Sequence, residues 1–193
     1  MSFQNYKIIS SLGERGKEGK VFLVRKRGRD YAMKQFKSTK SGNMIEREAQ
    51  LQSRASEIGI SPKVLSYDKE NKVIIMEKMD YNLFDILRKT NGKLQKKIQE
   101  DIVSIIKNLD KAKIFHNDPS PLNFMFKNDK LYIIDFGFAK PIDSKLSKKL
   151  SDQPNMDYMI IGFLLKIKKI FPDSNYTHLK KFISKENKEV LDL

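Results

Sequence analysis

The most specific signal in the sequence is HNDPSPLNFMFKNDKLYIIDFG, residues 116–137. It opens with a proline-rich loop that carries Asp118 and Asn123, and it closes with Asp135. Between Asn123 and Asp135 lie two apolar runs, residues 124–127 and 130–134, on either side of Asn128-Asp129. This pattern predicts a short β-hairpin. Because a hairpin returns the chain to its starting point, we expect Asn123 and Asp135 to lie close together.

These three side chains suit the transfer of a phosphoryl group. That reaction requires a carboxylate to orient the acceptor hydroxyl and oxygen ligands to hold magnesium against the phosphates. The set His116-Asn117-Asp118, Asn123 and Asp135-Phe136-Gly137 resembles the catalytic loop and the metal-binding D-F-G of the protein kinase superfamily. The resemblance implies ATP and Mg²⁺ as cofactors, Asp118 and Asn123 as catalytic residues, and Asn123 and Asp135 as metal ligands.

A lysine and a glutamate in the N-terminal half extend this resemblance. Ala32-Met33-Lys34 is similar to the kinase A-x-K, whose lysine contacts the α- and β-phosphates and also serves catalysis. The usual partner is a glutamate on the following helix, for which Glu46 and Glu48 are both candidates. We favour Glu48, because its surroundings resemble a recurring stretch of small atypical kinases. Outside this context, both charges would be interpreted as solvated.

A glycine-containing loop precedes them. Gly13, Gly16, Gly19 and Val21 resemble the kinase G-x-G-x-x-G-x-V, although the first glycine stands one residue early. Backbone N–H groups in such a loop can approach phosphate oxygens because glycine has no Cβ. An ordinary hairpin turn would also use glycine, so the position of the loop carries this assignment.

The segment at residues 74–80 looks like the last strand of an N-terminal lobe and the hinge that follows it. The resemblance places Met76 at the gatekeeper position, and places Glu77 and Met79 where backbone amides bind the adenine edge. Ala32 belongs to the same expected nucleotide pocket. An apolar strand is also consistent with plain core, and both interpretations can hold together.

The pattern of the whole chain predicts an α+β fold. Strands are expected at residues 6–12, 20–26, 30–36, 63–67, 72–77, 124–127 and 130–134, and helices at 42–58, 94–109, 156–171 and from 175. The resemblance implies a bilobal protein-kinase-like fold. Residues 1–79 would form an ATP-gripping lobe of five antiparallel strands plus one helix, and residues 80–193 a truncated, mainly helical lobe with the catalytic loop.

Several departures resemble small atypical kinases: the KEOPS-complex and RIO kinases, and the short kinases of large DNA viruses and bacterial effectors. Asn117 replaces the usual arginine, and Ser120 stands where many kinases carry lysine. No A-P-E motif follows Gly137. Asp157 and Gly162 resemble the D-x-x-x-x-G of a buried helix whose aspartate supports the catalytic loop; a helix N-terminal aspartate is the alternative. Such trimming implies a narrow substrate range or a partner protein that completes the second lobe.

Composition limits the remaining possibilities. The chain of 193 residues has no cysteine and two histidines, so disulfides, thiolate metal sites and His-rich clusters are excluded. No apolar run is long enough to suggest a membrane span. These features suit the cytoplasm, or a host cytoplasm for a viral or effector protein. The net charge of +14 favours anionic partners such as nucleic acid, although lysines on solvated helix faces would explain it equally well.

The sequence therefore predicts ATP- and Mg²⁺-dependent transfer of phosphate to serine or threonine of a protein substrate. Three alternatives stay open. The chain could be a pseudokinase used as a binding scaffold, a kinase of small molecules, or an ATPase-like kinase subunit of a tRNA-modification complex.

Overall fold

The computed structural model describes residues 5–13, 16, 18–174 and 176–190. The chain forms two compact units, Met1–Met79 with Asp135–Gly137, and Asp80–Ile134 with Phe138–Leu193. The elements of the first unit are β1 (Lys7–Ser11), β2 (Gly19–Lys26), β3 (Arg29–Phe36), α1 (Gly42–Glu57), β4 (Val64–Asp68) and β5 (Val73–Glu77). Those of the second are β6 (Tyr81–Asn82), α2 (Leu83–Lys89), α3 (Lys96–Lys111), β7 (Ile114–Phe115), β8 (Phe124–Lys127), β9 (Lys130–Ile133), β10 (Lys140–Pro141), α4 (Ser144–Lys149), α5 (Ile160–Ile170), α6 (Thr177–Lys180) and α7 (Lys185–Val190).

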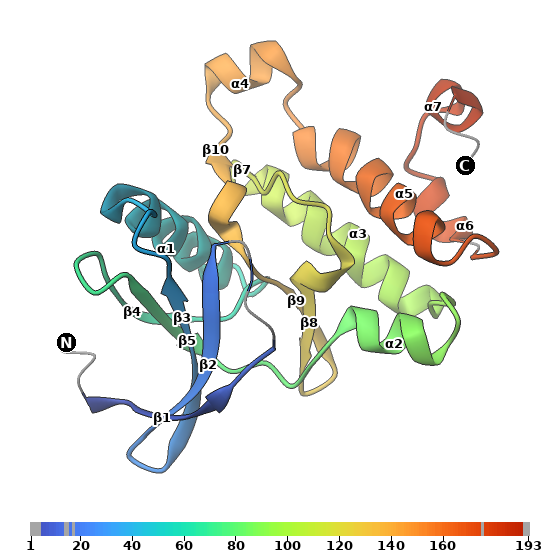
Figure 1. Ribbon diagram of the computed structural model, residues 1–193. Helices are drawn as coiled ribbons and strands as arrows, with labels where there is room; N and C mark the ends of the chain where they lie inside the picture. The colour runs from blue at the N-terminus through green and yellow to red at the C-terminus, as the bar shows by residue number, and fades with distance from the viewer. Residues whose placement is uncertain (1–4, 14–15, 17, 175, 191–193) are drawn as a thin grey trace. The chain divides into compact units, whose positions relative to one another are not determined.

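The first unit is built on a five-stranded antiparallel sheet with the order β1-β2-β3-β5-β4 (Figure 1). The third strand is central, and its neighbours fix the register of Lys34, which pairs with Val21 on β2 and Ile74 on β5. Because side chains alternate along a strand, the even-numbered residues of β3 share one face of the sheet. Ala32, Lys34 and Phe36 therefore point the same way.

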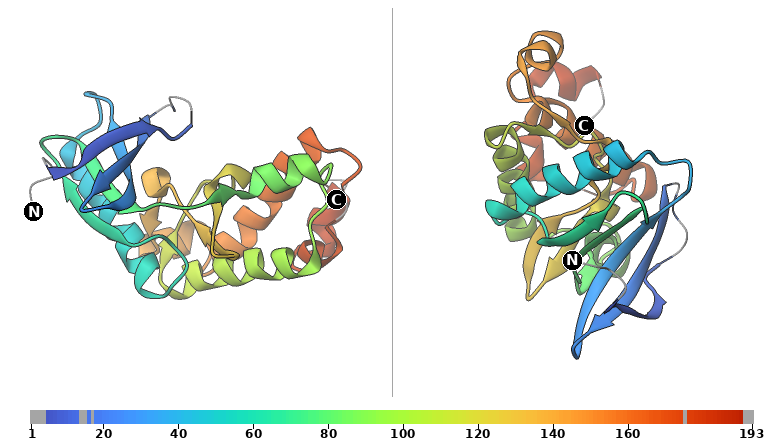
Figure 2. Two further views of the ribbon diagram at one scale, coloured as in Figure 1. Left: turned by 90° about the horizontal axis from the view of Figure 1, so that it is seen from below. Right: turned by 90° about the vertical axis from the view of Figure 1, so that its left-hand side faces the viewer.

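Helix α1 covers that face. Ser41 caps its first turn by accepting a hydrogen bond from the backbone N–H of Met44. Its apolar side, with Ile45 and Ala49, packs on Ala32 and neighbouring core residues of the sheet. The helix contacts β4 and β5, as the views of Figures 1 and 2 show. This packing aims the buried side of α1 at the end of β3 that holds Lys34.

The second unit is mainly helical and holds the predicted hairpin. Strands β8 and β9 pair in antiparallel fashion around Asn128 and Asp129, both of which have positive φ, as a two-residue turn of this kind requires. Helix α2 packs on β8 and α3 on β9 (Figure 2). Phe124 of β8 meets Phe163 of α5 edge to face, with ring centroids 5.4 Å apart.

The structure confirms the α+β fold class, with a five-stranded antiparallel sheet and one helix followed by a mainly helical region. The sequence pattern did not resolve the short helices α2 and α4. The helix expected at residues 156–171 starts differently, because a π-helical turn (Asn155–Met159) precedes α5. Among the described residues, no helix combines the length and the apolar character needed to cross a membrane.

Candidate functional site

A buried lysine forms the centre of a charged cluster in the first unit. Lys34 Nζ lies 2.6 Å from Glu48 Oε1 and 2.7 Å from Asp135 Oδ1. Glu48 reaches the lysine because it lies on the buried side of α1, next to Ala49. Three segments that are far apart in the sequence thus bring their charges together within this unit.

Of the two glutamates that the sequence left open, Glu48 contacts Lys34. Glu46 instead accepts hydrogen bonds from Lys69 Nζ and the Tyr67 hydroxyl, each at 3.1 Å, on the exposed side of α1. Helix geometry explains the difference, because positions two residues apart point to different sides of a helix.

Burial and charge act against each other in this cluster. Burial alone would lower the pKa of Lys34, but the carboxylates of Glu48 and Asp135 outweigh it and the pKa is raised. The pKa of Glu48 is raised, because burial and the nearby negative charge of Asp135 together outweigh the effect of the lysines. Lys34 is therefore a permanent cation at neutral pH, while Glu48 bears the cost of desolvation.

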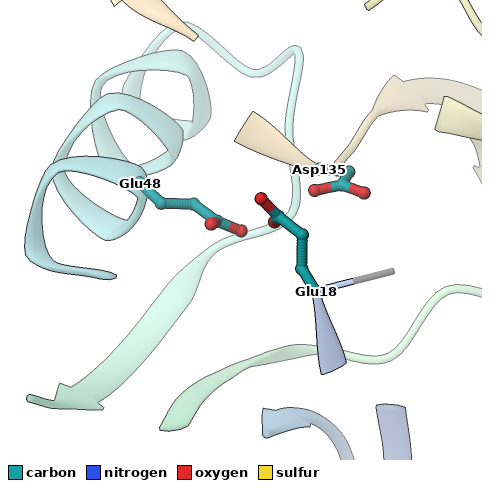
Figure 3. Close-up of side chains that lie close together, drawn as sticks. All are labelled: Glu18, Glu48 and Asp135. Carbon is teal, nitrogen blue, oxygen red and sulfur yellow. The ribbon is translucent and has the colours of Figure 1, made fainter. Parts of the chain in front are cut away.

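Two further charges belong to the cluster and were missed by sequence reasoning. Glu18, one residue before Gly19, lies 2.6 Å from Lys40 Nζ and 3.5 Å from Lys34 Nζ. Figure 3 shows its carboxylate facing those of Glu48 and Asp135, and one oxygen from each of the three lies within 4.8 Å of the others. No local sequence pattern singles out either residue, and only the folded structure shows that Lys40 is buried.

Replacing Glu48 by glutamine is expected to lower the rate of phosphotransfer about tenfold, because a neutral amide positions Lys34 less firmly than a carboxylate. The free energy of unfolding should change by no more than about 1 kcal/mol, because Asp135 and Glu18 still compensate the charge of Lys34 while a desolvated carboxylate is removed. Steady-state kinetics and urea unfolding measure the two effects. Glu46→Gln is the matched control on the same helix and should leave the rate unchanged; equal loss in both variants would contradict the assignment.

The predicted phosphate-binding loop is described in part. Gly13 has φ +79°, and added Cβ atoms at Gly13 and Gly16 would meet no close neighbour. Gly19 differs, because a Cβ there would overlap the carbonyl oxygen of Gln35 on β3. Gly19 therefore has a packing reason of its own. The loop residues at positions 14, 15 and 17 lie outside the described residues.

The residues predicted around the adenine ring belong to one sheet. Val21, Ala32 and Met76 pack in the same apolar cluster, and Ala32 pairs with Met76 in the β3–β5 register. Glu77 turns away from it, because its carboxylate accepts a hydrogen bond from the Lys63 N–H at 3.0 Å. Met79 is buried just after the strand ends.

A second cluster lies in the second unit, on the catalytic loop. Asn123 Nδ2 donates to Asp118 Oδ2 at 2.8 Å, and Lys166 Nζ on α5 donates to Asp118 Oδ1 at 2.9 Å. The Asn123 carbonyl accepts a hydrogen bond at 2.8 Å from the N–H of Ile134, the residue before Asp135. The hairpin therefore closes as predicted.

The support of this loop corrects one expectation. Asp157 was expected to hold the catalytic loop, but its side chain is exposed. Asn155 does this instead: it is fully buried, its Oδ1 accepts from the His116 N–H at 2.9 Å, and its Nδ2 donates to Asp110 Oδ1 at 2.6 Å. The π-helical turn places position 155, rather than 157, on the inner side of the chain.

The donor atoms suit the predicted magnesium ligands. Asn123 uses Nδ2 on Asp118, so its Oδ1 is the atom that a cation would take. The Asp135 side chain is 43% exposed and accessible to a ligand. An amide oxygen and a carboxylate are ligands of the kind that Mg²⁺ prefers.

Comparison with known proteins identifies the family of the chain. The model of the protein kinase domain family matches residues 6–159, which is most of the chain. The chain belongs to the protein kinase family. Lys34, Glu48, Asp118, Asn123 and Asp135 all lie inside the matched kinase domain, while Lys166 lies beyond it.

Individual relatives match different shares of the chain. The human MAPK/MAK/MRK overlapping kinase is 28% identical over 188 residues, which cover 91% of this chain and 43% of that protein. The KEOPS complex subunit Bud32 of Pyrococcus abyssi is 33% identical over 127 residues, 61% of this chain and 58% of the relative. A probable bifunctional tRNA threonylcarbamoyladenosine biosynthesis protein of Methanocaldococcus jannaschii is 36% identical over 102 residues, 49% of this chain and 17% of the relative. The kinase domain thus spans about half the length of the first two relatives.

Proposed function

We propose that this kinase domain transfers the γ-phosphoryl group of ATP, with Mg²⁺, to serine or threonine of a protein substrate. The observation that carries the proposal is that each unit holds one complete set of charged groups. Lys34, Glu48 and Asp135 form one set, and Asp118 and Asn123 form the other.

Each set has a separate task in this proposal. Lys34 binds the phosphates of ATP as a permanent cation, and Glu48 holds the lysine in place. The carboxylate of Asp118 orients the acceptor hydroxyl for in-line attack and takes up its proton. Gly13, Gly16 and Gly19 offer backbone N–H groups to the phosphates, while Val21, Ala32, Met76, Glu77 and Met79 surround the adenine.

Asp135 and Asn123 would hold Mg²⁺. When bound, the ion neutralises charge on the phosphate oxygens. Catalysis then depends on positioning and charge neutralisation, because the protein forms no covalent bond to the phosphoryl group.

The test is incubation with γ-labelled ATP and Mg²⁺, first with the domain alone and then with a cell lysate, followed by phosphosite mapping. We expect label on serine and threonine of the domain or of lysate proteins. The label should disappear when a chelator removes Mg²⁺. A domain that binds MgATP but labels no acceptor would be a binding scaffold, and label confined to small molecules would contradict the protein acceptor.

A second candidate is a kinase-like subunit that works with a tRNA-modification complex. It is supported by the relatives named as a KEOPS subunit and as tRNA threonylcarbamoyladenosine biosynthesis proteins. The net charge of +14 would favour contact with RNA in such an assembly. ATP hydrolysis that rises when the partner subunits and tRNA are added, without phosphorylation of added proteins, would favour this candidate.

The proposal includes a partner protein that extends the second unit and restricts the substrate. In the first candidate the partner would present the acceptor segment to Asp118. Affinity capture from a lysate, followed by labelling of the captured proteins, distinguishes a partner from a passing substrate.

A further inference from the structure

We propose that Lys166 is a further catalytic residue, a cation that holds Asp118 before the reaction and contacts the transferred phosphoryl group during it. This inference rests on the proposed function and names a group that the catalytic loop itself does not contain. Between Phe115 and Phe124 the loop has no lysine or arginine.

The contact with Asp118 is direct and uses the one oxygen that Asn123 leaves. Asn123 Nδ2 holds Oδ2 at 2.8 Å, and Lys166 Nζ holds Oδ1 at 2.9 Å. The carboxylate is therefore oriented from both sides, with one neutral donor and one cation. Two donors on separate elements fix the plane of a carboxylate better than either alone.

The backbone of α5 is built to bring this lysine to the loop. A Cβ on Gly162 would lie 2.6 Å from Pro119 Cγ, so the absence of a side chain lets the helix lie against the residue next to Asp118. Lys166 follows Gly162 by four residues, and residues four apart share one face of a helix. The close approach at Gly162 thus places Lys166 beside Asp118.

The chemistry gives the cation a task. The acceptor oxygen that Asp118 orients must approach the γ-phosphorus to within about 3–3.5 Å before attack. Because Lys166 Nζ contacts Asp118, its flexible side chain would bring a positive charge towards the equatorial oxygens of that phosphoryl group. The side chain is 46% exposed, so it can follow the phosphoryl group without unpacking the helix.

Transfer of the γ-phosphoryl group needs no further reactant. A bond forms between the acceptor oxygen and the γ-phosphorus, and the bond from that phosphorus to the β–γ bridging oxygen breaks, leaving its electron pair on ADP. The hydroxyl proton passes to Asp118. Lys166 stays protonated throughout and offsets negative charge on the phosphoryl oxygens.

A half-exposed ion pair with no catalytic task is the competing explanation. Such pairs contribute little to folding, so the two explanations differ in what they predict for the rate. A structural pair would change the rate little, whereas a phosphoryl-contacting cation affects turnover more than substrate binding.

The experiment measures kcat and KM in γ-labelled phosphotransfer, together with thermal unfolding, for three variants. Lys166→Met should lower kcat about 10- to 100-fold with KM for ATP within about threefold, because the contact strengthens in the transition state. Lys166→Arg should recover most of the rate, since it restores the cation. Lys169→Met removes an exposed lysine three residues further along α5 and should behave as wild type.

If Lys166→Met kept the wild-type kcat, this inference would be overturned, while the proposed function would still stand. A loss that Lys166→Arg does not recover, or that Lys169→Met shares, would also overturn it, because charge at position 166 would then not be the cause. Absence of phosphotransfer in the wild-type domain, with MgATP binding intact, would overturn the proposed function and this inference with it.

Discussion

Asp135→Asn is expected to lower phosphotransfer about 10³-fold while the domain stays folded. Asparagine keeps an oxygen that can accept a hydrogen bond from Lys34, but it loses the negative charge with which Asp135 would bind Mg²⁺ in the proposed function. It also tolerates the positive φ of this position (64°), whereas alanine would add backbone strain. The loss of rate can therefore be attributed to the charge.

The chain offers a matched control for this variant. Asp129 also has positive φ (59°) but lies exposed in the turn between β8 and β9. Asp129→Asn makes the same chemical change in the same backbone conformation and should leave the rate unchanged. Initial rates at saturating MgATP, with circular dichroism to verify folding, provide the comparison. If Asp135→Asn retained more than a tenth of the wild-type rate, the assignment of Asp135 as a metal ligand would be wrong.

The second large effect concerns stability. Asn155→Leu should lower the free energy of unfolding of the second unit by about 3–5 kcal/mol. Leucine has a similar size but removes the hydrogen bonds that the Asn155 side chain makes with the His116 N–H and the Ile114 carbonyl. It also removes one of the two hydrogen bonds that residue 155 donates to Asp110 Oδ1. Burial already raises the pKa of Asp110, and the hydrogen bonds from Asn155 oppose that rise. The variant keeps the backbone N–H of residue 155 on Asp110 but loses the side-chain donor, so the buried carboxylate is stabilised less.

Denaturant unfolding, with hydrogen exchange of the α3 amides to report on this unit, measures the change. Asn187→Leu, at an exposed position on α7, is the control and should shift the free energy of unfolding by no more than about 0.5 kcal/mol. A loss below about 1 kcal/mol in Asn155→Leu would mean that water replaces the amide, and that Asn155 does not hold the loop.

Local sequence patterns predicted most of the elements. The strands around Lys34 and the hairpin after Asn123 follow from short-range alternation and turn residues. The periodic apolar residues of α3 likewise gave a helix close to its observed bounds. The sequence also contains a local indication of helix α2, because Asn82 and Asp85 have the spacing of a capping box.

Contacts between distant segments could not be predicted in the same way. Lys166 was one charge in a basic run, and its partner Asp118 lies 48 residues earlier. Glu18 and Lys40 are 22 residues apart and form their ion pair only in the folded structure. Asp157 was expected to support the catalytic loop, but Asn155 does so. The difference arises because a π-helical turn precedes α5 and changes which residue faces inward.

The segment Asp135–Gly137 belongs to the first unit, and this limits how the chain can be divided into fragments. This triplet is encoded more than fifty positions after the strand that completes the sheet, so no single cut separates the two units. A fragment ending at Met79 would contain every strand of the sheet and yet lack one of the anions that stabilise Lys34 as a cation. Two separately expressed fragments would rebuild the first unit only if the D-F-G segment of the later fragment bound to the earlier one. Complementation between the fragments would therefore depend on these three residues.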